Sequence, residues 1–233
     1  MFPLSVENQK IARNIVEKLK AEREKRGDKL SVITFKYLQD ILDKNEKNFV
    51  QKLIDVKPKD YGKLEPFLGI LPVPKNLKKI KGQEYIWKNE KKEIAIQYLP
   101  RNVYKAYKKL NKAVKKDLGR QLLIKSGYRS PAYQVLTFLY YLVEEHKFNH
   151  ARTMPFVAIP GYSEHGYPRL QAIDFITQDG IIQGREASFE NTKEYEWLLK
   201  NAQKFHFYLS YPKNNKYNVA FEPWHWHYEN PKT

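Results

Sequence analysis

The stretch IPGYSEHGYPRLQAIDF, residues 159 to 175, decides how the second half of this chain folds. Glycines and prolines break it into turns up to Pro168, and the apolar run that follows favours a short buried strand over residues 172–176. Asp174 interrupts that run, and a carboxylate among apolar neighbours is costly unless it is paired or bound to a metal. His165 lies nine residues earlier, so two neighbouring segments can direct both side chains to one point.

A third side chain comes from FEPWHWHY, residues 221–228, where Glu222 and His225 are three positions apart. A mononuclear catalytic zinc takes three protein ligands from His, Asp or Glu and keeps one open position for water. A His and an Asp at this spacing, taken alone, are more often a structural pair than metal ligands. The FEPWHWHY motif adds a third candidate ligand and therefore favours a metal site. His165, Asp174 and His225 are therefore the predicted zinc ligands.

Glu222 is predicted to act as the general base of such a centre. If His225 binds the metal, Glu222 can accept a proton from the attacking water and later deliver it to the leaving amine. His227 projects to the same side as His225 in an extended strand. It could equally support the metal site or contact the substrate, so no ligand role is assigned to it.

Several motifs in a fixed order carry a family resemblance. SGYRS (126–130) followed by Gln134, PGYSEH (160–165) with AIDF, YLSYP (208–212) and EPWHWHY together resemble the zinc D-alanyl-D-alanine carboxypeptidases. Relatives of that family include L,D-carboxypeptidases and phage endolysins of similar fold. The resemblance covers residues 121–228 and implies a small antiparallel sheet with flanking helices.

The resemblance also implies roles for individual residues. It implies zinc at His165, Asp174 and His225, Glu222 as the base, Arg129 and Gln134 contacting the substrate, and Ser163 beside the metal site. Arg129 in isolation is more typical of a surface salt bridge. Beside SGY and with the resemblance it becomes a clamp for a substrate carboxylate or carbonyl, since a guanidinium binds oxyanions through two hydrogen bonds.

The chain departs from the family pattern at two places. The family usually separates its His and Asp by seven residues with a glycine between them, whereas this chain has nine and places Leu170 where that glycine would fall. The additional residues lie in GYPR (166–169), at the mouth of the predicted site, where they bear on substrate choice. His206 also stands where a glycine is common.

Composition limits the classes of protein that fit. The chain has 233 residues and 42% hydrophobic content, enough for a core, and its lack of cysteine excludes thiol nucleophiles, Cys-ligated zinc and disulfides. The net charge of +16 is compatible with nucleic acid, anionic lipid or an anionic cell-wall polymer as partner. Most of the excess is lysine in the first 120 residues, which favours a solvated surface and no specific nucleic-acid partner.

No stretch approaches the roughly 18 apolar residues that suggest a membrane span. The first residues do not have the pattern of a signal peptide either, so the export route cannot be read from the sequence.

Periodicity predicts an α+β fold with a small central antiparallel sheet and flanking helices, preceded by N-terminal helices. Ser5 is expected to cap a first helix that closes near Gly27, and a second helix is expected from Thr34 to Val56. A proline-rich stretch, residues 57–74, then favours a boundary between an N-terminal helical segment (1–60) and a zinc peptidase domain (61–233).

The later elements are shorter. Helices are expected over residues 103–118, from Pro131, and around Trp197 and Leu198. Strands are expected over residues 84–87 and 94–99 around a turn, after Arg120, around Val157, and over residues 172–176 and 207–209.

The predicted function is that of a zinc peptidase acting on peptidoglycan stem peptides, most simply a D-alanyl-D-alanine carboxypeptidase. Its substrate would place it at the cell wall or elsewhere outside the cytoplasm. An L,D-carboxypeptidase or an endopeptidase on the same material is the alternative within that class. A non-catalytic zinc-containing cell-wall binding module is the alternative from another class, and a nucleic-acid-binding protein is a third on charge alone.

Overall fold

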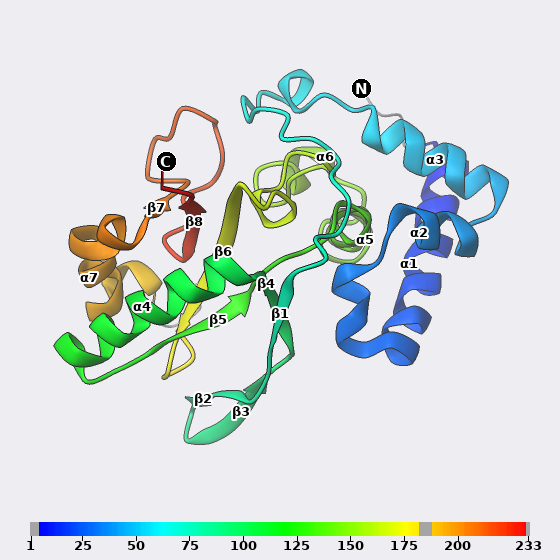
Figure 1. Ribbon diagram of the computed structural model, residues 1–233. Helices are drawn as coiled ribbons and strands as arrows, with labels where there is room; N and C mark the ends of the chain where they lie inside the picture. Colours follow the sequence, from blue (N-terminus) through cyan, green and yellow to red (C-terminus); the bar gives the residue numbers. More distant parts are fainter. Residues whose placement is uncertain (1–4, 182–187, 232–233) are drawn as a thin grey trace. The chain divides into compact units, whose positions relative to one another are not determined.

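A computed structural model describes residues 5–181 and 188–231 of the chain (Figure 1). The chain folds into two compact units. One unit comprises Met1–Val73, Arg129–Gly166 and Asn214–Ala220, and the other comprises Pro74–Tyr128, Tyr167–Lys213 and Phe221–Thr233. No helix within the described ranges is both long and apolar enough to cross a membrane.

The first unit is helical and begins with α1 (Val6–Arg26). The Ser5 hydroxyl caps this helix by accepting the N–H of Asn8, and Gly27 ends it with a φ of 53°, so both predicted ends are confirmed. The other helices of the unit are η1 (Gly27–Val32), α2 (Phe35–Ile41), α3 (Lys44–Ile54), η2 (Pro58–Tyr61), α5 (Pro131–Tyr140), η3 (Tyr141–Glu145), α6 (His150–Thr153) and η4 (Glu164–Gly166).

The prediction of a single helix from Thr34 to Val56 is wrong, because the helix is interrupted at Leu42. Asp43 accepts the N–H of Glu46 at 2.9 Å, and the Glu46 carboxylate accepts the N–H of Asp43 at 2.9 Å. This capping box starts α3 as a new helix. The apolar periodicity continues across the break because both helices bury residues in the same core.

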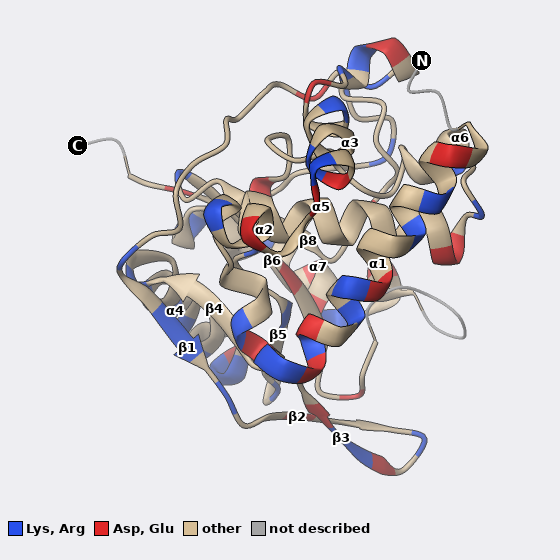
Figure 2. Ribbon diagram, turned by 90° about the vertical axis from the view of Figure 1, so that its right-hand side faces the viewer, with Lys and Arg blue, Asp and Glu red and all other residues tan. Residues whose placement is uncertain are grey.

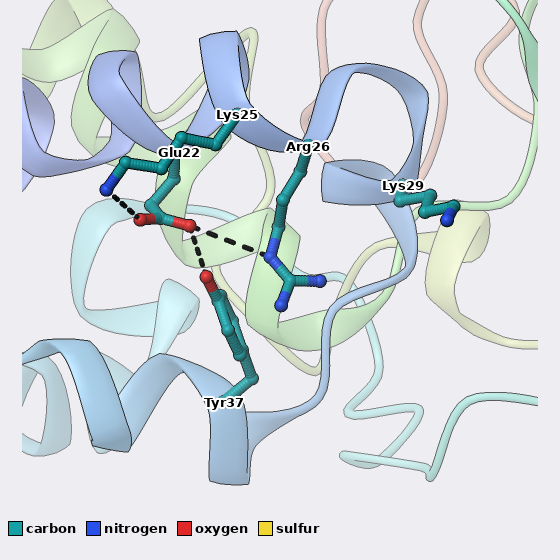
Figure 3. A pocket seen from close by; sticks show the side chains of 5 residues that line it. All are labelled: Glu22, Lys25, Arg26, Lys29 and Tyr37. Atoms are coloured by element: carbon teal, nitrogen blue, oxygen red, sulfur yellow. Dashed lines mark hydrogen bonds and ion pairs between the residues drawn. The ribbon is translucent and has the colours of Figure 1, made fainter.

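A buried carboxylate joins α1 to α2 in this unit. Glu22 is 7% exposed, and its carboxylate accepts hydrogen bonds from the Tyr37 hydroxyl and from Lys25 Nζ. Arg26 lies 3.6 Å from Glu22 through its Nε and stacks over the Tyr37 ring (Figure 3). Several donors thus compensate the buried charge. Through these contacts Glu22 links α1 to α2, and we call this group of contacts the Glu22 tie.

The second unit contains the sheet. Strands β5 (Leu122–Ser126), β6 (Leu170–Thr177), β8 (His225–Glu229) and β7 (Phe207–Leu209) form an antiparallel sheet in that order. Helices α4 (Arg101–Leu118) and α7 (Lys193–Asn201) share a core with its strands, and the short helices η5 (Phe189–Asn191) and η6 (Ala202–Phe205) flank α7. The α+β prediction with its antiparallel sheet, flanking helices and N-terminal helices is confirmed.

Two antiparallel strand pairs accompany this sheet. One pairs β1 (Leu77–Ile80) with β4 (Gln97–Pro100), and the other is the hairpin of β2 (Gln83–Trp87) and β3 (Glu90–Ile94). The turn of the hairpin is only Lys88 and Asn89, both with positive φ, so the polar residues expected in the turn form β3 instead. The strand expected over residues 94–99 is correspondingly divided between β3 and β4.

The strand expected around Val157 is wrong. The N–H groups of Phe156 and Val157 both donate to the Thr153 carbonyl at 3.1 Å, which makes this segment a turn after α6. Val157 is apolar because it is buried in the helical core, at 5% exposure. The boundary between residues 60 and 61 stays a prediction.

Candidate metal centre and active site

Asp174 and His225 face each other on neighbouring strands. They are directly paired in the register of β6 and β8, which run side by side (Figure 1). His225 Nδ1 lies 2.9 Å from Asp174 Oδ1, and the two residues are 5% and 8% exposed. Because side chains alternate along a strand, Ile173 and Phe175 point to the opposite face and enter the core. Core packing on one face therefore directs Asp174 and His225 together on the other.

His165 lies in the short helix η4 and is 1% exposed. Its carbonyl accepts the N–H of Arg129 at 3.0 Å, which ties the turn to the SGYRS motif. A Cβ on Gly166 would come within 3.0 Å of the Arg129 carbonyl, so the close approach of these backbones favours glycine there.

The ligand atoms offered by His165, Asp174 and His225 lie within 4.8 Å of one another, so the three residues could hold a metal ion. Two imidazoles and one carboxylate fit a catalytic zinc, because such a site uses three protein ligands of this kind. The three side chains predicted as ligands from the sequence are thus brought together, while their role as ligands stays a proposal.

Glu222 is positioned beside His225 by the backbone. The N–H of His225 donates to the Glu222 carbonyl at 3.0 Å, and the Glu222 N–H donates to the Tyr211 carbonyl at 3.1 Å. Its Oε2 lies 3.6 Å from His225 Nδ1, with the Glu222 side chain 16% exposed. Trp226 Nε1 donates to the Pro223 carbonyl at 2.9 Å and closes the turn. Glu222 is therefore a partly accessible carboxylate next to a candidate metal ligand.

The proposed substrate residues lie around the start of α5. Arg129 is partly buried, and its Nε has no hydrogen-bond partner among residues 5–181 and 188–231. Gln134 is 2% exposed, and its amide nitrogen donates to the Ala158 carbonyl at 2.8 Å. Ser163 is 8% exposed and accepts the N–H of Gly166 through its carbonyl. Gln134 thus has a structural contact in addition to its proposed contact with substrate.

Sequence reasoning left His227 open and overlooked Tyr128. His227 Nδ1 lies 2.7 Å from Ser210 Oγ and Nε2 lies 3.2 Å from Glu229, which holds the ring outside the candidate ligand set. Tyr128 is 1% exposed, its hydroxyl has no hydrogen-bond partner within the described part of the chain, and burial raises its pKa. Tyr128 lies inside the SGYRS motif, and this position is the sequence feature that could have marked it as a candidate site residue.

The family model for D-alanyl-D-alanine carboxypeptidase, VanY, matches residues 96–231 of the chain. The chain belongs to this family. The resemblance recognised over residues 121–228 is confirmed, and the match begins earlier, just before β4, so that it also includes α4.

Two individual proteins illustrate the relationship. The chain is 34% identical over 144 residues to the Bacillus subtilis (strain 168) protein named "Putative carboxypeptidase YodJ". That match covers 60% of this chain and half the length of the relative. The chain is also similar to the LdcB LD-carboxypeptidase, at 31% identity and a TM-score of 0.51, over 66% of this chain and 68% of that one. The structure of LdcB is described as revealing the molecular basis of peptidoglycan recognition.

Proposed function

We propose that this chain is a zinc-dependent carboxypeptidase that removes the terminal D-alanine from peptidoglycan stem peptides. One observation carries the proposal. In a chain of the D-alanyl-D-alanine carboxypeptidase family, three candidate zinc ligands gather within 4.8 Å, and Glu222 lies 3.6 Å from one of them. The cell wall is then its place of action, because the substrate lies there.

A bound zinc ion would polarise the scissile carbonyl and lower the pKa of the attacking water. Glu222 would accept the proton of that water and deliver it to the leaving amine, since its side chain is partly accessible and close to His225. Arg129 would bind the substrate carboxylate or stabilise the oxyanion, with Gln134 and Ser163 contacting the substrate.

The scissile bond defines a second candidate within the class. The similarity to LdcB favours an L,D-carboxypeptidase, which cleaves between an L-residue and a terminal D-alanine. A D,D-carboxypeptidase cleaves between two D-alanines instead. An endopeptidase on the same material would release no terminal amino acid, and a binding module would release nothing.

Mass spectrometry of muropeptides tests these alternatives together. The purified protein is incubated with stem pentapeptides and with stem tetrapeptides, with and without a chelator. Chelator-sensitive loss of D-alanine from the pentapeptide alone supports the D,D activity, and loss from the tetrapeptide alone supports the L,D activity. Unchanged muropeptides with zinc-loaded protein would contradict the proposed enzyme.

A further inference from the structure

Helix α4 carries a continuous stripe of positive charge. At 100° per residue, all seven of its basic side chains fall within an arc of about 120°. Each of them is exposed in the structure. The stripe, which we call the α4 stripe, consists of Arg101, Lys105, Lys108, Lys109, Lys112, Lys115 and Lys116.

The opposite face of α4 fixes the direction of this stripe. Val103, Leu110 and Val114 are fully buried and Tyr107 is 5% exposed, all within the core that α4 shares with the sheet. The Tyr107 hydroxyl also donates to the Leu122 carbonyl at 2.8 Å. The helix cannot rotate its charges away from solvent without exposing this core, so the α4 stripe is a permanent feature of the surface.

Strand β1 and its flanks extend the charge. Lys78 Nζ lies 5.9 Å from the centre of the Tyr104 ring of α4, which places the strand beside the helix. Figure 2 shows the basic residues gathered on α4 and β1. Residues 75–81 contain four lysines and no acid, and α4 contains one acid, Asp117. These two segments therefore carry ten of the sixteen net positive charges of the chain.

The α4 stripe has no internal compensation. Exposed helices usually place acidic residues three or four positions from their lysines, and like charges at that spacing destabilise a helix. Here Lys105 and Lys109, and likewise Lys108 and Lys112, are four apart with no acid between them on the stripe. Asp117 accepts a hydrogen bond from Trp197 Nε1 at 2.8 Å. None of the seven cations forms an ion pair with another described residue.

We propose that the α4 stripe binds a linear phosphodiester polymer of the cell wall. From Arg101 to Lys116 the stripe is about 22 Å long, because a helix rises about 1.5 Å per residue, and an extended polyanion can follow it. Lysine binds phosphate as a point charge and needs no fixed geometry, which suits a flexible chain. The cell-wall source rests on the proposed function, whereas the binding of a phosphodiester chain does not.

Two other polyanions fit the α4 stripe less well. A single-stranded nucleic acid would be expected to stack its bases on exposed aromatic rings, and Tyr107 is buried while Tyr104 is only partly exposed. An anionic membrane would be expected to accept exposed apolar residues, and α4 exposes no large hydrophobic side chain.

Binding of the 233-residue chain to poly(glycerol phosphate) at several salt concentrations tests the proposal. In the stripe variant Lys105, Lys109, Lys112 and Lys116 are all changed to Gln. In the matched control variant four exposed lysines of α1, α2 and α3 are changed to Gln, namely Lys10, Lys36, Lys47 and Lys52. Both variants lose the same net charge, so any difference between them reports on position.

The stripe variant is expected to lose at least about tenfold in affinity at low salt. The slope of log K against log salt should become shallower by about 3, since each phosphate contact contributes about 0.7 to the slope for a single chain. The control variant should stay near the wild type. Removing like charges should leave the melting temperature of the stripe variant equal to or above that of the wild type.

Three results would overturn the proposal. One is equal weakening of both variants, which would reduce the effect to net charge. Another is the absence of binding by the wild type at low salt. The third is stripe-dependent binding that is tighter to a single-stranded DNA oligonucleotide or to phosphatidylglycerol vesicles of equal phosphate content, which would assign a different occupant.

Discussion

At the scale of single residues, the candidate zinc ligands provide the first prediction. His165→Ala or Asp174→Ala should lose the metal, because two remaining ligands are too few for a tight site. Metal analysis of the purified variants after zinc reconstitution measures this loss. Stoichiometric zinc in both variants would mean that other residues bind the ion. His227→Ala is the matched control, since the structure holds His227 with Ser210 and Glu229.

Arg129 provides a prediction that separates its backbone from its side chain. Its N–H holds the His165 carbonyl at 3.0 Å, and this bond survives a side-chain substitution. Arg129→Ala should therefore keep fold and zinc while kcat/KM on a stem peptide falls, because the proposed partner of the guanidinium is the substrate. Arg129→Lys should recover only part of the loss, since lysine cannot bind an oxyanion through a planar fork. An unchanged kcat/KM in Arg129→Ala would return this residue to a structural role.

The departures from the family pattern also have an explanation at this scale. Leu170 is the first residue of β6, and its N–H donates to the Tyr167 carbonyl at 3.0 Å, so the longer spacing forms a turn before the strand. His206 has a φ of 63°, a left-handed conformation in which glycine is unstrained. A sequence pattern shows that such residues differ from the family but does not show the conformation they adopt.

At the scale of elements, the Glu22 tie between α1 and α2 gives a pH-dependent prediction. The hydrogen bond from Tyr37, followed by that from Lys25, lowers the pKa of Glu22. A lowered folded-state pKa adds stability above the unfolded pKa of about 4.3, and that stability is lost as pH falls through the folded value. Glu22→Gln should thus be less stable than the wild type at about pH 7, with a smaller difference at about pH 3.

Urea unfolding midpoints of the wild type, Glu22→Gln and Tyr37→Phe measure this effect. Tyr37→Phe removes the leading donor and keeps the ring beneath Arg26, so it should show the same trend with a smaller amplitude. Glu24→Gln is the control, because Glu24 is an exposed carboxylate of the same helix that does not join α2 to α1. A stability difference for Glu22→Gln that does not change with pH would contradict the tie.

The ends and interruptions of the helices differ in how well the sequence predicts them. The ends of α1 were predictable because Ser5 and Gly27 act within one turn of the helix. Apolar spacing does not predict the break at Leu42, because a capping box depends on hydrogen bonds between polar residues. The sequence around Val157 predicts a strand because buried turns and buried strands have similar apolar sequences.

At the scale of the whole molecule, the candidate site depends on contacts between distant parts of the sequence. Asp174 and His225 are 51 residues apart and meet only because β6 and β8 pair. Spacing alone does not predict that register, and the ordered family motifs indicated only which residues belong to the ligand set. The sequence alone also does not reveal the concentration of charge on α4. Its lysines look scattered along the sequence, and they share one face only once the helical spacing of α4 is applied.

We propose that the chain hydrolyses peptides with Glu222 as the base of a zinc centre. Glu222→Gln preserves side-chain volume and removes the proton acceptor, so zinc content and peptide affinity should stay close to those of the wild type. The rate of D-alanine release should fall by at least about 10²-fold, because general acid–base groups typically contribute about 10²- to 10⁴-fold.

The decisive measurement is therefore D-alanine release by the wild type and Glu222→Gln, with zinc content and peptide affinity determined on the same two preparations. We expect equal zinc, near-equal affinity and a large loss of turnover in the variant. Release by Glu222→Gln at the wild-type rate, or no release by either protein when zinc is bound, would contradict this proposal.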